Sequence, residues 1–93
     1  MERSMNLREV KNKINESYVG SLTVELYNWS EDEEQGFDLM VNILDSDGEL
    51  VDDMTVAIFT EEEEKRAKAE AKKVHKNLSE NYSGKKVKYT ETR

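Results

Sequence analysis

Few side chains in this sequence are of the kinds that carry out covalent or metal chemistry. His75 is the only histidine, and there is no cysteine. A zinc site built from cysteine and histidine, or a cysteine nucleophile activated by a histidine, therefore cannot be assembled within one chain. His75 lies among lysines in a stretch of helical periodicity, which is typical of an ordinary residue on the surface or at the boundary of a helix.

An acidic turn, Asp45-Ser46-Asp47-Gly48, resembles the interior of a calcium loop. Aligning Gly48 with the loop glycine, however, puts Ile43 and Met54 at the first and last ligand positions, where carboxylates are required. The segment is therefore interpreted as a hairpin turn. The four glycines are dispersed along the chain, so no phosphate-binding loop is present. We expect no catalytic residue, no metal and no cofactor, and a protein that is not an enzyme.

Acidic and basic residues are segregated along the sequence. No Lys or Arg occurs between Ile14 and Glu64, a block with sixteen carboxylates, whereas residues 65–93 hold ten Lys or Arg and three Glu. Helix chemistry explains the carboxylates at 61–64, which precede a basic stretch and occupy a helix N-terminus, where the helix dipole stabilises negative charge. It does not explain the carboxylates of the preceding loops and strands.

The hydrophobic periodicity predicts an α+β fold of order α-β-β-β-α. Capping patterns at Asn6 and Thr60, each with a Glu three residues later, begin a short helix over about residues 6–16 and a long helix of about 22 residues. Between the helices, alternating residues indicate a three-stranded antiparallel meander, with strands over about residues 18–29, from Phe37 to Ile43, and after the Asp-Gly turn. Residues 85–92 are favoured as a fourth, lysine-bearing edge strand.

Alternation along the strands divides the expected sheet into two faces. We expect both helices to cover the apolar face, which bears Leu22, Val24, Leu26, Phe37, Leu39, Val41, Ile43, Met54, Val56 and Ile58. The other face would show Glu25, Tyr27, Trp29, Asp38, Met40, Asn42, Asp53, Thr55 and Phe59. On that face carboxylates are interleaved with aromatic side chains, a combination typical of protein-binding surfaces. The alternative is that Tyr27 and Trp29 only cover a small satellite cluster or form cross-strand pairs within the sheet.

The hypothesis that follows is a non-enzymatic, acidic interaction module for a basic protein. Rows of carboxylates can take the place of phosphates, so the favoured partner is a nucleic-acid-binding enzyme inhibited by mimicry. In size, charge and mixed α/β makeup the chain resembles small acidic phage-encoded inhibitors, including some anti-CRISPR proteins. The residues expected to contact the partner are Tyr27, Trp29, Glu31, Asp32, Glu33, Glu34, Asp38, Asp45, Asp47 and Glu49.

Two alternatives remain open at this point. The first is a homo-oligomeric structural or accessory domain that pairs through the aromatic face or the terminal edge strand. The second is a weak nucleic-acid binder that uses the basic C-terminal half of the chain. The element order is similar to that of double-stranded RNA-binding domains, but that family begins its second helix with lysines, whereas this helix begins with glutamates 61–64, which would repel phosphates.

Length and composition bound the remaining expectations. At 93 residues the chain fits a single domain, 1–93, with one core. The absence of cysteine and of an apolar leader or membrane-spanning run favours a reducing, cytoplasmic location with no membrane contact.

Overall fold

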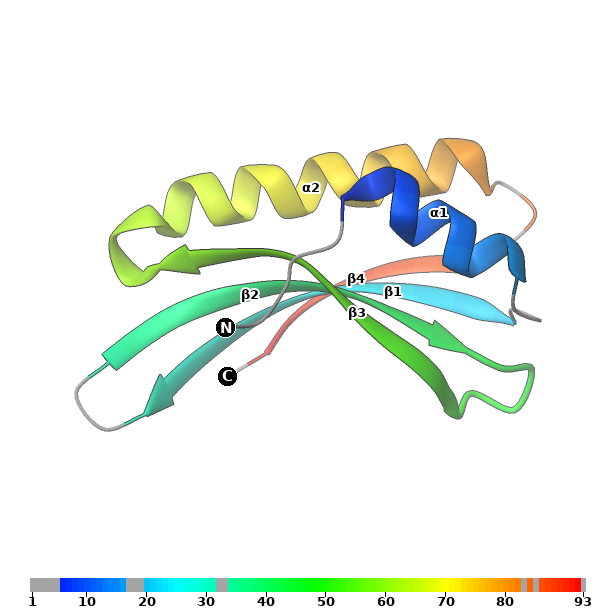
Figure 1. Cartoon of the computed structure of the whole chain (residues 1–93), viewed down its shortest axis with the longest axis horizontal. Helices are drawn as coiled ribbons and strands as arrows, with labels where there is room; N and C mark the ends of the chain where they lie inside the picture. Colours follow the sequence, from blue (N-terminus) through cyan, green and yellow to red (C-terminus); the bar gives the residue numbers. More distant parts are fainter. Residues whose placement is uncertain (1–5, 17–19, 32–33, 83, 85, 93) are drawn as a thin grey trace.

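Four strands form one mixed sheet, and both helices lie across the same face of it (Figure 1). The structure is a computed structural model that describes residues 6–16, 20–31, 34–82, 84 and 86–92. In chain order the elements are α1 (Leu7–Glu16), β1 (Ser21–Glu31), β2 (Glu34–Leu44), β3 (Leu50–Thr60), the 3-10 turn η1 (Glu61–Glu63), α2 (Glu64–Asn81) and β4 (Lys86–Thr92).

The predicted α+β order is confirmed, including the fourth strand. The order in the sheet is β3-β2-β1-β4, so the meander occupies three positions and β4 pairs with the outer side of β1. That pairing is parallel, whereas the β1–β2 and β2–β3 pairs are antiparallel. A parallel neighbour requires a long crossover, and α2 supplies it. The two edges of the sheet are therefore β3 and β4.

The helix starts follow the capping patterns expected from the sequence. The backbone N–H of Glu9 donates to Asn6 Oδ1 at 2.9 Å and so caps α1. At the second start, Glu63 Oε1 accepts from both the backbone N–H and the hydroxyl of Thr60, each at 3.1 Å. The first three residues after Thr60 form the tighter η1 turn, so the regular helix begins at Glu64 and has 18 residues.

The hydrophobic core lies between the helices and one face of the sheet. From the helices it receives Val10, Ile14, Ala67, Ala71, Val74 and Leu78, all buried. The small alanines let α2 approach the sheet closely, and Val87 and Tyr89 of β4 pack against the margin of the same cluster. Among the described helices, none is long and apolar enough to cross a membrane.

A β-bulge in β3 corrects the expected division of the sheet faces. Leu39 pairs with Ala57 and Met40 with Thr55, so Val56 is an extra residue opposite β2. Because side chains alternate with a period of two, one extra residue moves every later side chain to the other face. Ile58, expected in the core, is therefore 44% exposed on the open face, whereas Phe59, expected on the open face, is buried at 6% exposure. Val56 itself is only partly buried.

The Asp-Gly hairpin between β2 and β3 forms as the sequence indicates. Gly48 adopts a φ of 85°, which is in the left-handed region that glycine enters without strain. The carboxylate of Asp45 accepts the backbone N–H groups of Asp47 and Glu49 through Oδ1, both at 2.9 Å. Asp45 is thus committed to holding the turn.

Candidate protein-interaction surface

The face of the sheet that the helices leave open carries the aromatic candidates. On β1, Tyr27 is opposite Asp38 of β2, and Trp29 is opposite Gly36. Tyr27 is 38% exposed, and Trp29 is half-buried. The expected grouping of these two aromatic residues with Asp38 is therefore present at one end of the sheet.

Trp29 is held in place by two contacts across the β1–β2 pair. Its ring lies so close to Gly36 that a Cβ atom built there would be 2.7 Å from Trp29 Cζ2. The indole Nε1–H donates to Asp38 Oδ1 at 3.0 Å. An aromatic ring over a cross-strand glycine covers backbone that would otherwise be bare, and the hydrogen bond fixes the ring orientation.

Beside this ring the surface is hollowed into an open depression of about 330 Å³. Its lining comes from the ends of three strands and consists of Trp29, Glu34, Gln35, Ile58, Phe59 and Thr60. Sequence reasoning missed Ile58, Gln35 and Thr60 as contributors. The bulge at Val56 brings Ile58 to this face, and no residue type in the sequence marks that bulge. We call the group Tyr27, Trp29, Glu34, Asp38 and Ile58 the Trp29 surface.

In the middle of the open face, polar side chains of three strands hydrogen-bond to one another. The carboxylate of Glu25 accepts from Thr92 Oγ1 at 2.8 Å and from Asn42 Nδ2 at 3.4 Å. Glu25 is half-buried and ties β4 to β1 and β2. This carboxylate is therefore a structural group that joins strands, not one offered to a partner.

Three of the remaining acidic candidates lie at the opposite end of the sheet from Trp29. Asp45, Asp47 and Glu49 belong to the β2–β3 hairpin, whereas Glu31 and Glu34 pair at the other end of β1 and β2 (Figure 1). The strands between these turns have 11 residues each, or about 35 Å at ~3.3 Å per residue. The expected contact set is thus divided in two. Of its other members, Glu34 is exposed, Glu31 ends β1, and Asp32 and Glu33 lie outside the described residues.

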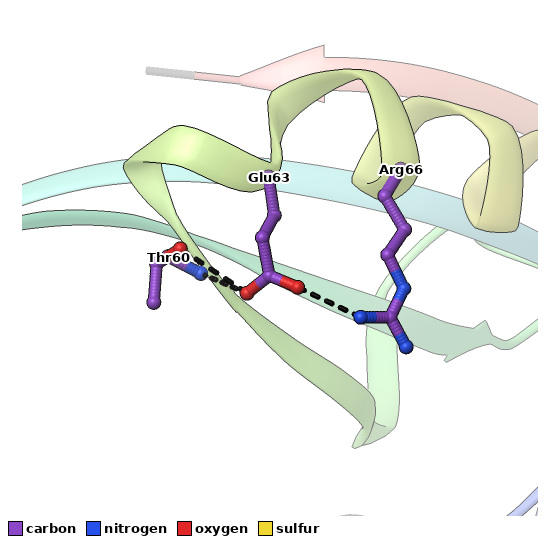
Figure 2. A network of polar contacts seen from close by, with 3 residues as sticks. All are labelled: Thr60, Glu63 and Arg66. Atoms are coloured by element: carbon purple, nitrogen blue, oxygen red, sulfur yellow. Dashed lines mark hydrogen bonds and ion pairs between the residues drawn. The ribbon is translucent and has the colours of Figure 1, made fainter.

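The glutamates at the start of α2 interact with their own helix. Figure 2 shows Glu63 pointing back to Thr60 while its second oxygen accepts from Arg66 Nη1 at 2.8 Å. The two hydrogen bonds from Thr60, followed by the charge of Arg66, lower the pKa of Glu63 below its ordinary value. Glu64 pairs with Lys68 at 3.2 Å. These contacts agree with the interpretation of the helix charges as local stabilisation.

His75 occupies a structural position at the boundary between α2 and β4. Its Nε2 lies 3.1 Å from the carbonyl oxygen of Val87, and its ring centroid is 6.1 Å from that of Tyr89. Burial, and then a hydrogen bond to Glu91, raises the pKa of Tyr89. Among the described residues, no three His, Cys, Asp or Glu side chains converge as a metal site would require.

Comparison of the chain with models of known protein families, with curated proteins and with solved structures gives no match.

Proposed function

We propose that this protein is a non-enzymatic interaction module that presents the Trp29 surface to a basic protein. The observation that carries this proposal is the fixed indole of Trp29, which lies over Gly36, donates to Asp38 and lines an open depression. A large aromatic side chain that is already held in one orientation loses little entropy when it is buried by a partner. Such residues are the usual centres of protein-binding hot spots.

The charge around the Trp29 surface determines which sign of charge a partner must carry. Residues 20–60, which include β1, β2 and β3, contain no Lys or Arg. Gly36 pairs with Thr60, so the exposed glutamates 61 and 62 follow at the same end of the sheet as Glu34. Carboxylates around an aromatic centre favour a basic partner, speed its association and exclude acidic competitors.

A nucleic-acid-binding enzyme is the class of basic protein that this surface fits best. Such enzymes bind phosphates through clustered Lys and Arg, and carboxylates can occupy those sites in place of phosphates. Because the two acidic hairpins lie at opposite ends of the sheet, the Trp29 surface acts as a compact patch that replaces a few phosphates, not a continuous row. Its apolar residues then supply contacts that a nucleic acid lacks.

The experiment is capture of basic proteins from a cell lysate by three immobilised forms of the protein, with elution by salt. The test variant carries Glu34→Lys at the Trp29 surface together with Glu31→Lys, since Glu31 is the cross-strand partner of Glu34. The matched control carries Asp47→Lys and Glu49→Lys at the opposite hairpin, which changes the net charge equally and spares Asp45, the residue that holds the turn.

We expect the wild-type protein and the control to retain the same basic protein and the test variant to release it at low salt. Added DNA or RNA should displace the captured protein if its nucleic-acid site is occupied. Equal retention by all three forms would contradict the proposal, because charge at the Trp29 surface would then have no effect. Retention lost equally in both variants would point to net charge alone and would also contradict it.

A further inference from the structure

The two edges of the sheet are chemically different. On β4 the exposed side chains include Lys86 and Lys88, and charged lysines are a common means of preventing another strand from adding to an edge. On β3 the exposed side chains include Leu50, Val51 and Ile58, with exposed fractions of 59%, 49% and 44%. Among the described strands, β3 pairs only with β2. No other described strand therefore covers its outer side, although the N–H of Thr60 at its end donates to Glu63.

The C-terminal half of β3 has the features of a docking edge. Residues 56–60, Val-Ala-Ile-Phe-Thr, are uncharged and rich in side chains that favour strands, whereas Asp52 and Asp53 guard the first half. A depression lies on each side of this half. The first is the 330 Å³ hollow beside Trp29, and the second, of about 400 Å³ on the helix side, is lined by Val56, Ala57, Ile58, Phe59, Glu63, Arg66 and Glu70.

Both depressions reach Ile58 and Phe59, so the strand runs between them. We propose that an extended segment of the partner pairs with the outer edge of β3 at residues 56–60 and adds a fifth strand to the sheet. Side chains of an extended segment point alternately to the two faces, so successive residues would enter the two depressions in turn. This inference rests on the proposed function, because it specifies how the basic partner binds.

The register of the β2–β3 hairpin indicates which backbone groups are available. The N–H of Asp45 donates to the carbonyl oxygen of Glu49, which directs the backbone of Asp45 toward β3. Because antiparallel residues alternate in direction along a strand, Asp38, seven residues earlier, is directed away from β3. Its partner Ile58 then occupies a pair without mutual hydrogen bonds and presents its N–H and C=O to the outer edge.

The helix-side wall of this edge is held in one arrangement. Figure 2 shows Glu63 between Thr60, the last residue of β3, and Arg66 of α2. The guanidinium carbon of Arg66 also lies 5.8 Å from the centroid of the Phe59 ring, within cation–π range. A strand added to β3 would therefore meet a formed wall, so little of the binding free energy would be spent on ordering it.

The chemistry of the two sides defines the segment. The side beside Trp29 and Ile58 is apolar with Glu34 at its rim, so it fits an aliphatic residue. The helix side bears Glu63 and Glu70, so it fits a basic residue that shares these carboxylates with Arg66 and Lys73. The occupant is thus an extended segment that alternates aliphatic and basic residues. A second copy of this chain fits poorly, because antiparallel self-pairing centred on Ile58 would bring aspartates 52 and 53 of one copy toward glutamates 63 and 64 of the other.

The test uses an acetylated, amidated peptide, Lys-Val-Lys-Val-Lys-Val-Lys, titrated into the ¹⁵N-labelled protein. We expect chemical-shift changes in the amides of residues 56–60 and slower hydrogen exchange of the Ile58 N–H. A peptide with proline in place of the central valine should bind about tenfold more weakly, because one or two backbone hydrogen bonds are lost. On the protein side, Ile58→Pro should weaken binding by a similar factor relative to Ile58→Ala, which keeps the N–H.

Three outcomes would overturn the strand addition. The first is that the proline peptide binds as tightly as the valine peptide. The second is that the amides of residues 56–60 show no chemical-shift change at the highest soluble peptide concentration. The third is that these amides shift when the protein concentration is raised without peptide, which would indicate self-pairing. The peptide comparison does not depend on whether Ile58→Pro folds. If Glu31→Lys with Glu34→Lys abolishes capture of the partner but the proline peptide binds normally, the proposed function stands and the strand addition fails.

Discussion

Trp29 and Gly36 are cross-strand partners in which the larger residue occupies the space that the smaller one leaves. A Cβ atom at position 36 would lie 2.7 Å from Trp29 Cζ2 and 2.8 Å from the carbonyl oxygen of Phe59. Neither distance is compatible with a methyl group, and the second contact is to backbone, which cannot rotate away. The indole can therefore occupy its position only because residue 36 is a glycine. The indole is also the centre of the proposed surface.

Gly36→Ala should therefore destabilise the fold by about 1–3 kcal/mol, the usual effect of inserting atoms into a filled site. It should also displace Trp29, the only tryptophan, and so change its fluorescence in the folded state. Unfolding in urea followed by fluorescence measures both effects. Gly84→Ala is the matched control, because no atom beyond the two adjacent residues lies within 4 Å of a Cβ built at position 84. Equal stability of the two variants would show that the contact at Gly36 is not restrictive.

Because of the bulge at Val56, we predict opposite effects on stability for substitutions at two adjacent residues. Phe59 is buried, so Phe59→Ala should cost about 3–5 kcal/mol through the lost burial and the cavity left behind. Ile58 is on the open face, so Ile58→Ala should cost less than about 1 kcal/mol. The free energy of unfolding in urea measures both. The reverse order of costs would mean that β3 alternates without a bulge and that Ile58 faces the core.

The same bulge marks the limit of what periodicity can predict. Alternation correctly placed Leu22 to Ile43 because β1 and β2 are regular in their pairing with each other. In β3 an extra residue reverses the faces, and Val, Ala, Ile and Phe in succession are apolar in either register, so the sequence holds no signal for the change. Likewise, charge counts could not separate the two acidic hairpins, since their positions depend on strand length and pairing. Local signals, such as Asn6 at the start of α1, were sufficient because they act over one helical turn.

Tyr82 connects the two helices and provides a third prediction. Its hydroxyl lies 3.1 Å from Asn15 Oδ1 and 3.4 Å from the carbonyl oxygen of Lys11, and burial raises its pKa. Tyr82→Phe should lower the free energy of unfolding by about 0.5–1.5 kcal/mol through loss of these hydrogen bonds. In this variant, amide hydrogen exchange should accelerate more in α1 than in the sheet, relative to the wild-type protein. Tyr27→Phe, which changes an exposed tyrosine on the other face, should have little effect. Similar losses in both variants would contradict a specific role for the Tyr82 hydroxyl.

Glu63 predicts a pH dependence of stability with a defined sign. Hydrogen bonds from the N–H and hydroxyl of Thr60, followed by Arg66, lower its pKa in the folded protein below the ordinary value of 4.5. A carboxyl group with a lowered folded pKa stabilises the fold fully above its unfolded pKa, and this contribution is lost as the pH falls through the folded pKa. Glu63→Gln should therefore be less stable than wild type at pH 7, and the difference should shrink as the pH is lowered below about 4.5.

Urea unfolding of both proteins between pH 7 and pH 3 measures this difference directly. The control is Glu62→Gln, which removes the same charge from an exposed neighbour in the same turn, so that the general effect of a negative charge near the helix start is subtracted. The gap between wild type and Glu63→Gln should exceed that of the control at pH 7. Because Glu63 also forms the helix-side wall of the β3 edge, Glu63→Gln should weaken binding of the alternating peptide as well. A gap that widens as the pH falls would contradict the hydrogen bonds from Thr60 as the source of the stabilisation.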